Sequence, residues 1–226
     1  TENPTGSYRR EFTVPSDWED QAIILRFEGV DSAFHVWVNG KEVGYSQGSR
    51  LPSEFDITKL VHEGKNVIAV QVYQWSEASY IEDQDMWWLS GIYRDVYLLA
   101  RPKAHVRDYF IKTTLDENYE NGKLEIETYV LNQKNNPITN YQLEIKLVNH
   151  LYEEVGIRDL NNITIDVMDE EKISAVIPID NPNKWSAENP YLYHLLLTLK
   201  DEKGNVIEVI PTKVGFRTVE VKDGVL

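Results

Sequence analysis

The chain has 226 residues and no cysteine, and 42% of its residues are hydrophobic. Disulfides, thiolate nucleophiles and zinc–thiolate sites are therefore excluded. A formal net charge of −14 disfavours nucleic acid and anionic membranes as partners, because an acidic chain repels phosphate groups. The same charge is compatible with a neutral sugar or a bound cation, or it serves solubility alone.

The first part of the chain shows the two-residue alternation of β-strands rather than a helical period. Asn39-Gly40 stands between two alternating runs, and this dipeptide favours a tight hairpin because both residues tolerate positive φ. A helical turn is predicted over residues 56–61, with Asp56 as its N-cap and Gly64 as its end. The predicted strands cover residues 22–27, 33–38, 41–45, 66–73 and 93–99.

A domain boundary is predicted near Pro102, because proline lacks the backbone N–H that a strand ladder needs. The spacing of the strands beyond it favours a small antiparallel sandwich, while the irregular loops before it favour a jelly-roll-like sandwich. We therefore predict an all-β chain with domains at residues 1–101 and 102–222. The predicted strands of the second domain are 106–114, 123–131, 142–148, 172–179, 193–199 and 206–210.

Residues 80–88 form an unusual segment, in which three carboxylates, an amide and two indoles lie close together. Carboxylates accept hydrogen bonds from sugar hydroxyls, indole faces cover the C–H face of a pyranose ring, and the oxygens also suit a hard cation. The alternative is a loop that buries Trp87 beneath a solvated acidic turn. Both interpretations hold if Trp87 anchors the loop while one aspartate faces a ligand.

Residues 49–56 form the second segment of interest. We predict that Arg50 pairs with Glu54 or Asp56 and thereby fixes a long loop. A ligand-binding role for Arg50 is the alternative.

No catalytic residue is assigned. Residues 44–48 fit G-x-S-x-G, the nucleophile elbow of α/β-hydrolases, but that elbow needs a long helix after it, and Pro52 prevents one. Glycoside hydrolysis needs two carboxylates on opposite sides of the scissile bond, whereas the carboxylates of residues 80–88 share one loop. None of the histidines shows metal-ligand spacing, and His35, within a predicted strand, is interpreted as structural.

Seven further runs of residues are informative together. They are ENPTG at 2–6, FEGVDSAF at 27–34, SRLPSEFD at 49–56, EDQDMW at 82–87, SGIYRDV at 90–96, WSAENP at 185–190 and VGFR at 214–217. These runs resemble the N-terminal part of bacterial β-galactosidases of glycoside hydrolase family 2. The similarity is dense in residues 1–100, sparse in 103–180, and returns near the end of the chain.

This resemblance implies a jelly-roll sugar-binding domain, truncated at its N-terminus, then an immunoglobulin-like sandwich. A TIM barrel that carries both catalytic glutamates would follow, with residues 223–226 beginning the linker to it. By the same resemblance, Asp85 binds substrate at the galactosyl 6-hydroxyl and ligates a sodium ion shared with the barrel. Mg²⁺ is expected in the parent enzyme, with most of its ligands outside this chain.

We therefore expect a non-catalytic part of a retaining β-galactosidase that hydrolyses terminal β-D-galactosides such as lactose, and that forms one wall of the substrate pocket. The alternatives are an independent carbohydrate-binding module, the same region of another family member such as a β-glucuronidase, and a purely structural immunoglobulin-like protein. Expected partners are a β-galactoside, the chain's own barrel and further copies in a homo-oligomer.

The location of the parent enzyme is expected to be cytoplasmic, with the periplasm as the alternative. No stretch approaches the roughly 18 apolar residues of a membrane span, and no signal peptide is recognised. The chain begins with Thr1 rather than Met, so we expect it to be cut from a longer protein, and any targeting segment would lie in the missing part.

Overall fold

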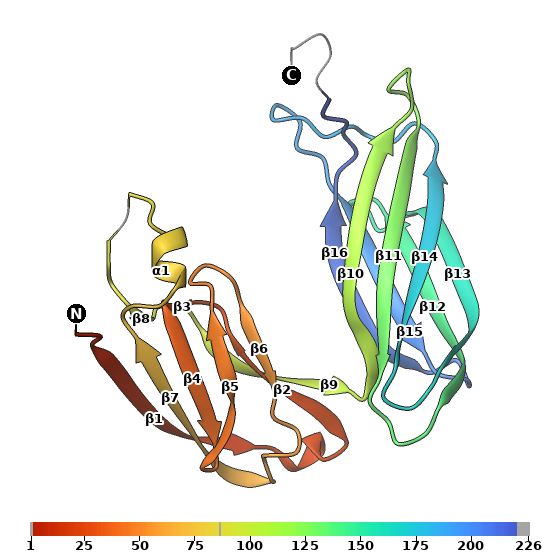
Figure 1. Cartoon of the computed structure of the whole chain (residues 1–226). Helices are drawn as coiled ribbons and strands as arrows, with labels where there is room; N and C mark the ends of the chain where they lie inside the picture. Colours follow the sequence, from red (N-terminus) through yellow and green to blue (C-terminus); the bar gives the residue numbers. More distant parts are fainter. Residues whose placement is uncertain (1, 86, 221–226) are drawn as a thin grey trace. The chain divides into compact units, whose positions relative to one another are not determined.

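The computed structural model describes residues 2–85 and 87–220, and the chain divides into two compact units, Thr1–Pro102 and Lys103–Leu226. The expected linker at residues 223–226 lies outside the described part. All sheets of both units are antiparallel (Figure 1). The all-β fold class predicted from the alternation is therefore confirmed. Among the described residues, no helix has the length and apolarity that crossing a bilayer requires.

The first unit contains two main sheets, with strand orders β1-β7-β4-β5 and β6-β2-β9, and a short ladder β3-β8. Its elements are β1 (Thr5–Val14), η1 (Ser16–Trp18), β2 (Gln21–Phe27), β3 (Val30–Asp31), β4 (Ala33–Val38), β5 (Lys41–Gln47), β6 (Ser53–Asp56), β7 (Gly64–Tyr73), α1 (Ala78–Ile81), β8 (Gly91–Ile92) and β9 (Val96–Pro102).

The hairpin predicted at Asn39-Gly40 is confirmed. These two residues connect β4 to β5 with φ angles of 50° and 78°. The Asn39 side chain also accepts a hydrogen bond from the Val67 N–H and donates one to the Leu60 carbonyl, both at 2.9 Å. The turn is therefore bound both to β7 and to the loop before it.

The helical turn predicted at residues 56–61 is confirmed in part. Strand β6 ends at Asp56, and the Leu60 N–H then closes a single turn onto the Ile57 carbonyl at 2.8 Å. Asp56 caps this turn as predicted, because its Oδ1 accepts hydrogen bonds from the N–H and the hydroxyl of Thr58, at 2.9 and 2.5 Å. The turn does not continue to Gly64, which is the first residue of β7.

Three phenylalanines join the sheets of the first unit. Phe27 on β2 and Phe34 on β4 have ring centroids 4.9 Å apart, and Phe55 on β6 meets both rings edge-on at 6.1 and 6.0 Å. Phe27 and Phe34 are fully buried. Each such burial stabilises the fold by about 1.5–3 kcal/mol.

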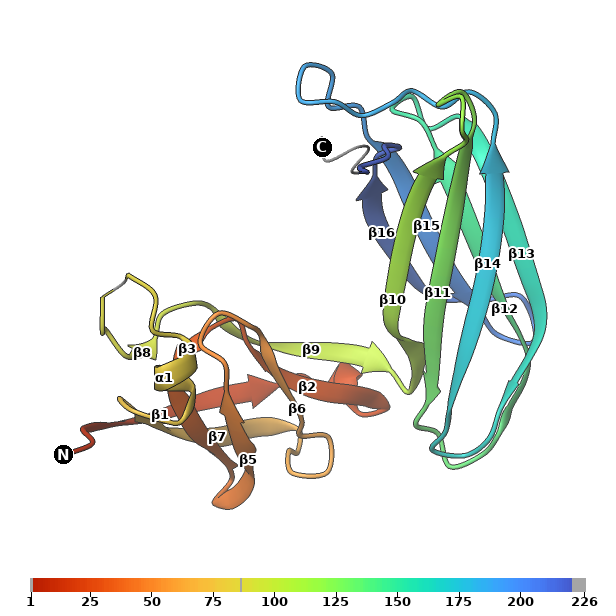
Figure 2. The ribbon, with the colours of Figure 1, turned by 45° about the horizontal axis from the view of Figure 1, so that its top comes forward.

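The second unit is a seven-stranded sandwich, with strand orders β10-β11-β14 and β13-β12-β15-β16 in two layers (Figure 2). Its core consists of alternating side chains such as Leu143 and Ile145 on β12 and Leu195 and Leu197 on β15. The immunoglobulin-like sandwich is therefore confirmed. The strands are β10 (Ala104–Leu115), β11 (Gly122–Asn132), β12 (Ile138–Val148), β13 (Glu154–Ile165), β14 (Glu170–Ile179), β15 (Tyr193–Lys200) and β16 (Val206–Val214).

Candidate functional site

Seven runs of residues carry the family resemblance, and five of them meet at one end of the first unit. Thr5 of β1 pairs with Tyr73 of β7, so the start of β1 lies beside the end of β7. Helix α1 and residues 82–90 follow β7 directly, and β8 then pairs with β3. Figures 1 and 2 both show the N-terminus, α1 and β8 at this end of the unit. The loops that carry the candidate residues are therefore neighbours in space.

Glu82 connects the acidic segment to the turn before β6. The Ser49 N–H donates to Glu82 Oε1 at 3.0 Å, and the Ser49 hydroxyl donates to Oε2 at 2.5 Å. The Ser49 carbonyl in turn accepts a hydrogen bond from the Tyr93 hydroxyl. Ser49 is 0% exposed, so one buried serine joins three segments that lie far apart in the sequence.

Arg50 binds a carboxylate other than the predicted Glu54. Its Nη1 donates to Asp31 Oδ2 at 3.3 Å, whereas Glu54 pairs with Arg26 at 2.5 Å. The cause is strand register, because β2 and β6 place Arg26 directly opposite Glu54. The Arg50 guanidinium also lies over the Tyr93 ring, 5.6 Å from its centroid. Of the two predicted partners of Arg50, Glu54 is therefore wrong, although Arg50 does help to fix the loop.

Arg94 also packs against Tyr93, and it binds the backbone of two neighbouring segments. Its Nη1 donates to the carbonyls of Glu28 and Arg50, at 3.2 and 3.1 Å, and its guanidinium carbon lies 5.1 Å from the Tyr93 centroid. Gly29 permits this packing, since a Cβ there would stand 2.8 Å from the Tyr93 ring. These contacts fix the SGIYRDV run against the FEGVDSAF run.

The Glu28 carboxylate is held by two neighbours. Arg26 Nε donates to its Oε1 at 2.6 Å, and the Tyr97 hydroxyl donates to the same oxygen. These hydrogen bonds, first from Arg26 and then from Tyr97, lower the pKa of Glu28 below its ordinary value. The bond to Glu28 also raises the pKa of Tyr97.

Asp85 is exposed, and no described residue bonds to its carboxylate.

Trp87, which follows the acidic run, does not anchor the loop. Its side chain is 83% exposed, so the prediction that it is buried is wrong. Trp88 makes the anchoring contact, with its ring centroid 5.2 Å from that of Trp75. Asn3 fixes Trp75 by accepting from its N–H and donating to its carbonyl, each at 2.9 Å.

The chain offers one carboxylate at this position for a cation. Within residues 2–85 and 87–220, no group of three histidine, cysteine, aspartate or glutamate residues is arranged to hold a metal. Asp85 has an oxygen donor of the type that hard cations prefer. A cation bound to Asp85 would therefore need oxygen ligands other than a cluster of carboxylates from the described residues.

Large apolar side chains are exposed beside Asp85. The most exposed are Tyr80, Ile81, Trp87 and Leu89 on the segment itself, with Leu51 on the neighbouring turn. A cluster of this kind marks a surface that contacts another molecule or a further part of the same protein.

The predicted site residues do not include Glu82, Ser49, Tyr93 or Asp31. Their contacts span long sequence separations, 33 residues for Ser49 and Glu82 and 44 for Tyr93 and Ser49. No local spacing could reveal them. The resemblance-bearing runs were the only available signal, because they mark the segments that meet here.

The fold defines a β-sandwich with a loop cluster at one end, followed by an immunoglobulin-like sandwich. Residues 1–102 match the family described as "Glycosyl hydrolases family 2, sugar binding domain", and residues 104–217 match "Glycosyl hydrolases family 2". The chain belongs to glycosyl hydrolase family 2.

Two curated relatives are β-galactosidases. That of Priestia megaterium is 46% identical over 224 residues, or 99% of this chain, and that of Pseudoalteromonas haloplanktis is 46% identical over 230 residues, or 100% of this chain. The chain spans 22% of the length of each relative. The crystal structure of a Bacteroides uniformis β-glucuronidase is similar with a TM-score of 0.89 and 27% identity, covering 96% of this chain and 27% of that one.

Proposed function

We propose that this chain is the sugar-binding and immunoglobulin-like part of a retaining β-galactosidase, and that the segment around Asp85 forms one wall of its galactoside pocket. The observation that carries the proposal is the anchoring of this segment. Glu82 and Trp88 fix its two ends, while the Asp85 carboxylate between them stays exposed and unpaired within the described residues. The 46% identity to β-galactosidases over nearly the whole chain supports the choice of substrate.

Asp85 acts by accepting a hydrogen bond from a sugar hydroxyl. Such charge-assisted bonds are shorter and stronger than neutral ones. A galactoside presents a neutral 6-hydroxyl to this carboxylate, whereas a glucuronide presents a carboxylate at the same carbon, which Asp85 would repel. The acidic wall therefore favours a β-galactosidase over the alternative β-glucuronidase, although the fold suits both.

A sodium ion at Asp85 would neutralise the carboxylate and polarise the same sugar hydroxyl. This chain's contribution is one ligand, and the remaining ligands come from the barrel.

The Mg²⁺ of the parent enzyme is bound mostly by residues outside this chain. The two catalytic glutamates also belong to the barrel, so the chain alone is inactive. The full enzyme is a homo-oligomer. Its location is the cytoplasm.

The test compares Asp85→Asn with Asp83→Asn in the full-length enzyme. Loss of one hydrogen bond to a charged group costs about 1.5–3 kcal/mol, or roughly 10- to 100-fold in binding. We expect Asp85→Asn to raise KM for a nitrophenyl β-galactoside by about that factor and to weaken its sodium dependence. Asp83 is exposed on the same segment, and its variant should behave as the wild type. Unchanged kinetics for Asp85→Asn would refute the proposal.

The inactivity of the chain alone is tested with the same substrate. We expect no hydrolysis by the purified 226-residue chain at concentrations where the full-length enzyme is readily measured. Turnover that persists through repurification would place catalytic groups in this chain.

A further inference from the structure

A second concavity lies at the end of the first unit opposite to Asp85. Strand β1 begins beside the Asp85 loops at Thr5 and ends at the concavity with Val14. A ten-residue strand spans about 30 Å, so the two places are well separated. The cavity has a volume of about 270 Å³. Pockets for drug-sized ligands measure roughly 300–1,000 Å³, so this one suits a single small ring.

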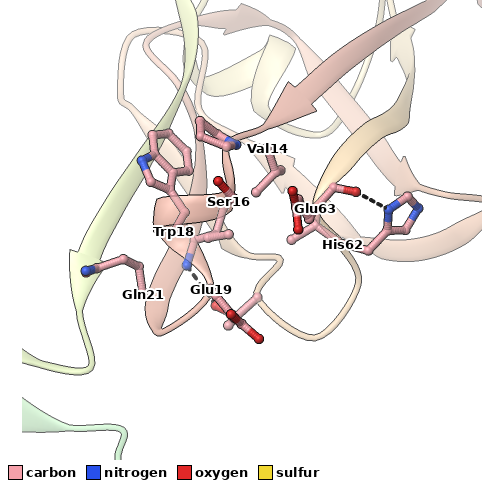
Figure 3. Close-up of a pocket in the computed structure, with 11 residues that line it drawn as sticks. Val14, Ser16, Trp18, Glu19, Gln21, His62 and Glu63 are labelled. Carbon is pink, nitrogen blue, oxygen red and sulfur yellow. Dashed lines mark hydrogen bonds between the residues drawn. The ribbon is translucent and has the colours of Figure 1, made fainter.

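The lining combines one indole with several polar side chains. Figure 3 shows the indole of Trp18, the hydroxyl of Ser16 and the carboxylate of Glu63 in sequence across the cavity. Glu19, Gln21 and Thr58 add further polar side chains to the lining. Trp18 also packs against the hydrophobic core of the unit, which holds its ring in place. An aromatic face beside hydrogen-bond acceptors is the arrangement that pyranose rings require.

One wall of this pocket is fixed by a buried asparagine. Asn66 Nδ2 donates to the carbonyls of His62 and Gly64, at 2.7 and 2.9 Å, and Asn66 Oδ1 accepts from the His62 N–H at 3.1 Å. The His62 imidazole points away from the other labelled side chains, and its Nδ1 donates to the Glu63 carbonyl at 2.8 Å (Figure 3). Glu63 is thus presented on a rigid loop, which reduces the entropy lost on binding.

The polar side chains of the lining are available to a ligand. Within the described residues, the side chains of Ser16, Glu19, Gln21 and Glu63 form no hydrogen bond or ion pair. Two carboxylates in one small cavity repel an anion. They accept hydrogen bonds from the hydroxyl groups of a neutral sugar without this cost.

We propose that this pocket is a second sugar-binding site, which takes a neutral pyranose with its C–H face on Trp18 and its hydroxyl groups on Glu63 and Ser16. The site is independent of the Asp85 loop and needs no residue from outside the first unit. It would hold one end of a longer glycan or a free monosaccharide away from the reaction centre.

The test uses the full chain labelled with 5-fluorotryptophan and observed by ¹⁹F NMR, with D-galactose and D-galacturonate as probes. The Trp18 resonance is assigned by its loss in Trp18→Phe, or, if that variant does not fold, by its shift in Ser16→Ala. We expect galactose to move this resonance with a dissociation constant on the order of 1 mM, as befits a ligand with few heavy atoms. Galacturonate should bind at least about fivefold more weakly, because its carboxylate meets Glu19 and Glu63.

Three variants make the result specific. Glu63→Gln should weaken galactose binding by roughly tenfold, since it removes a charged acceptor, and Glu117→Gln on an exposed turn should leave it unchanged. Asp85→Asn should also leave the Trp18 titration unchanged, which separates this site from the proposed galactoside wall. Absence of a galactose-dependent shift, a shift produced by Ca²⁺ but not by galactose, or equal affinity in Glu63→Gln would overturn the proposal.

Discussion

Ser49 and Glu82 show how one buried polar residue positions a functional loop. Both donors of Ser49 end on the two oxygens of Glu82. A buried donor left without a partner costs about 1–3 kcal/mol. We therefore expect Glu82→Ala to lower the free energy of unfolding of the first unit by about 1.5–3 kcal/mol, as measured by urea denaturation.

Asp83→Ala is the matched control, because Asp83 neighbours Glu82 but is exposed and bonds no described residue. Its effect should stay within about 0.5 kcal/mol. Equal destabilisation by both variants would mean that the Ser49–Glu82 contact does not fix the loop.

Glu28 gives the first unit a predictable sensitivity to acid. Its pKa is lowered from the ordinary 4.5 by Arg26 and Tyr97, so below that value the unfolded chain binds a proton that the folded chain resists. The stabilising contribution is complete above pH 4.5 and is lost as the pH falls through the lowered folded value. We expect Glu28→Gln to make the acid-side decline of the unfolding free energy less steep.

The measurement is urea denaturation at a series of pH values from neutral to well below 4.5. Glu117→Gln, on a turn of the second unit, provides the comparison and should keep the wild-type slope in the unfolding of the first unit. If Glu28→Gln retains that slope as well, the Arg26–Glu28–Tyr97 contacts contribute nothing to the acid response.

At the scale of elements, local sequence patterns predict the turns and strands whose conformation depends on neighbouring residues alone. The β4–β5 hairpin follows from Asn39-Gly40, because the required φ angles are set within the dipeptide itself. Strand β13 was not predicted, because Asn162 takes a φ of 62° where the pairing with β12 shifts register. A bulge of this kind breaks the alternation that identifies a strand.

The candidate site shows the same limit. The composition of the acidic segment identifies it, but which of its two indoles, Trp87 or Trp88, contacts the rest of the unit depends on Trp75. The partner of Arg50 depends likewise on the register of β2 and β6. Composition therefore locates the segment, and contacts with distant segments determine which of its side chains are anchored.

Gly122 tests the packing of the second sandwich. A Cβ at this first residue of β11 would lie 2.7 Å from the ring of Phe216, which is fully buried. Overpacking of a filled core costs typically about 1–3 kcal/mol, so we expect Gly122→Ala to destabilise the second unit by that amount in urea denaturation. Lys123→Ala, at the exposed next position, should change stability by less than about 0.5 kcal/mol. Indistinguishable variants would show that Phe216 is not packed as described.

At the scale of the whole molecule, each unit has its own hydrophobic core, and one end of the first unit exposes apolar side chains around Asp85. Relatives of the chain are several times longer, since the chain spans 22% of their length. On the proposed function, we expect the remainder of the longer protein to cover these apolar residues and to meet the Asp85 carboxylate.

The most direct measurement is a thermodynamic cycle in which the Asp85 carboxylate and the 6-hydroxyl of the sugar are removed separately and together. The kcat/KM of the full-length enzyme is determined for a nitrophenyl β-galactoside and for its 6-deoxy analogue, with wild type and with Asp85→Asn. If Asp85 binds the 6-hydroxyl, loss of that hydroxyl costs the wild type about 10-fold or more and costs the variant little. Equal penalties in both enzymes would show that Asp85 does not face the sugar.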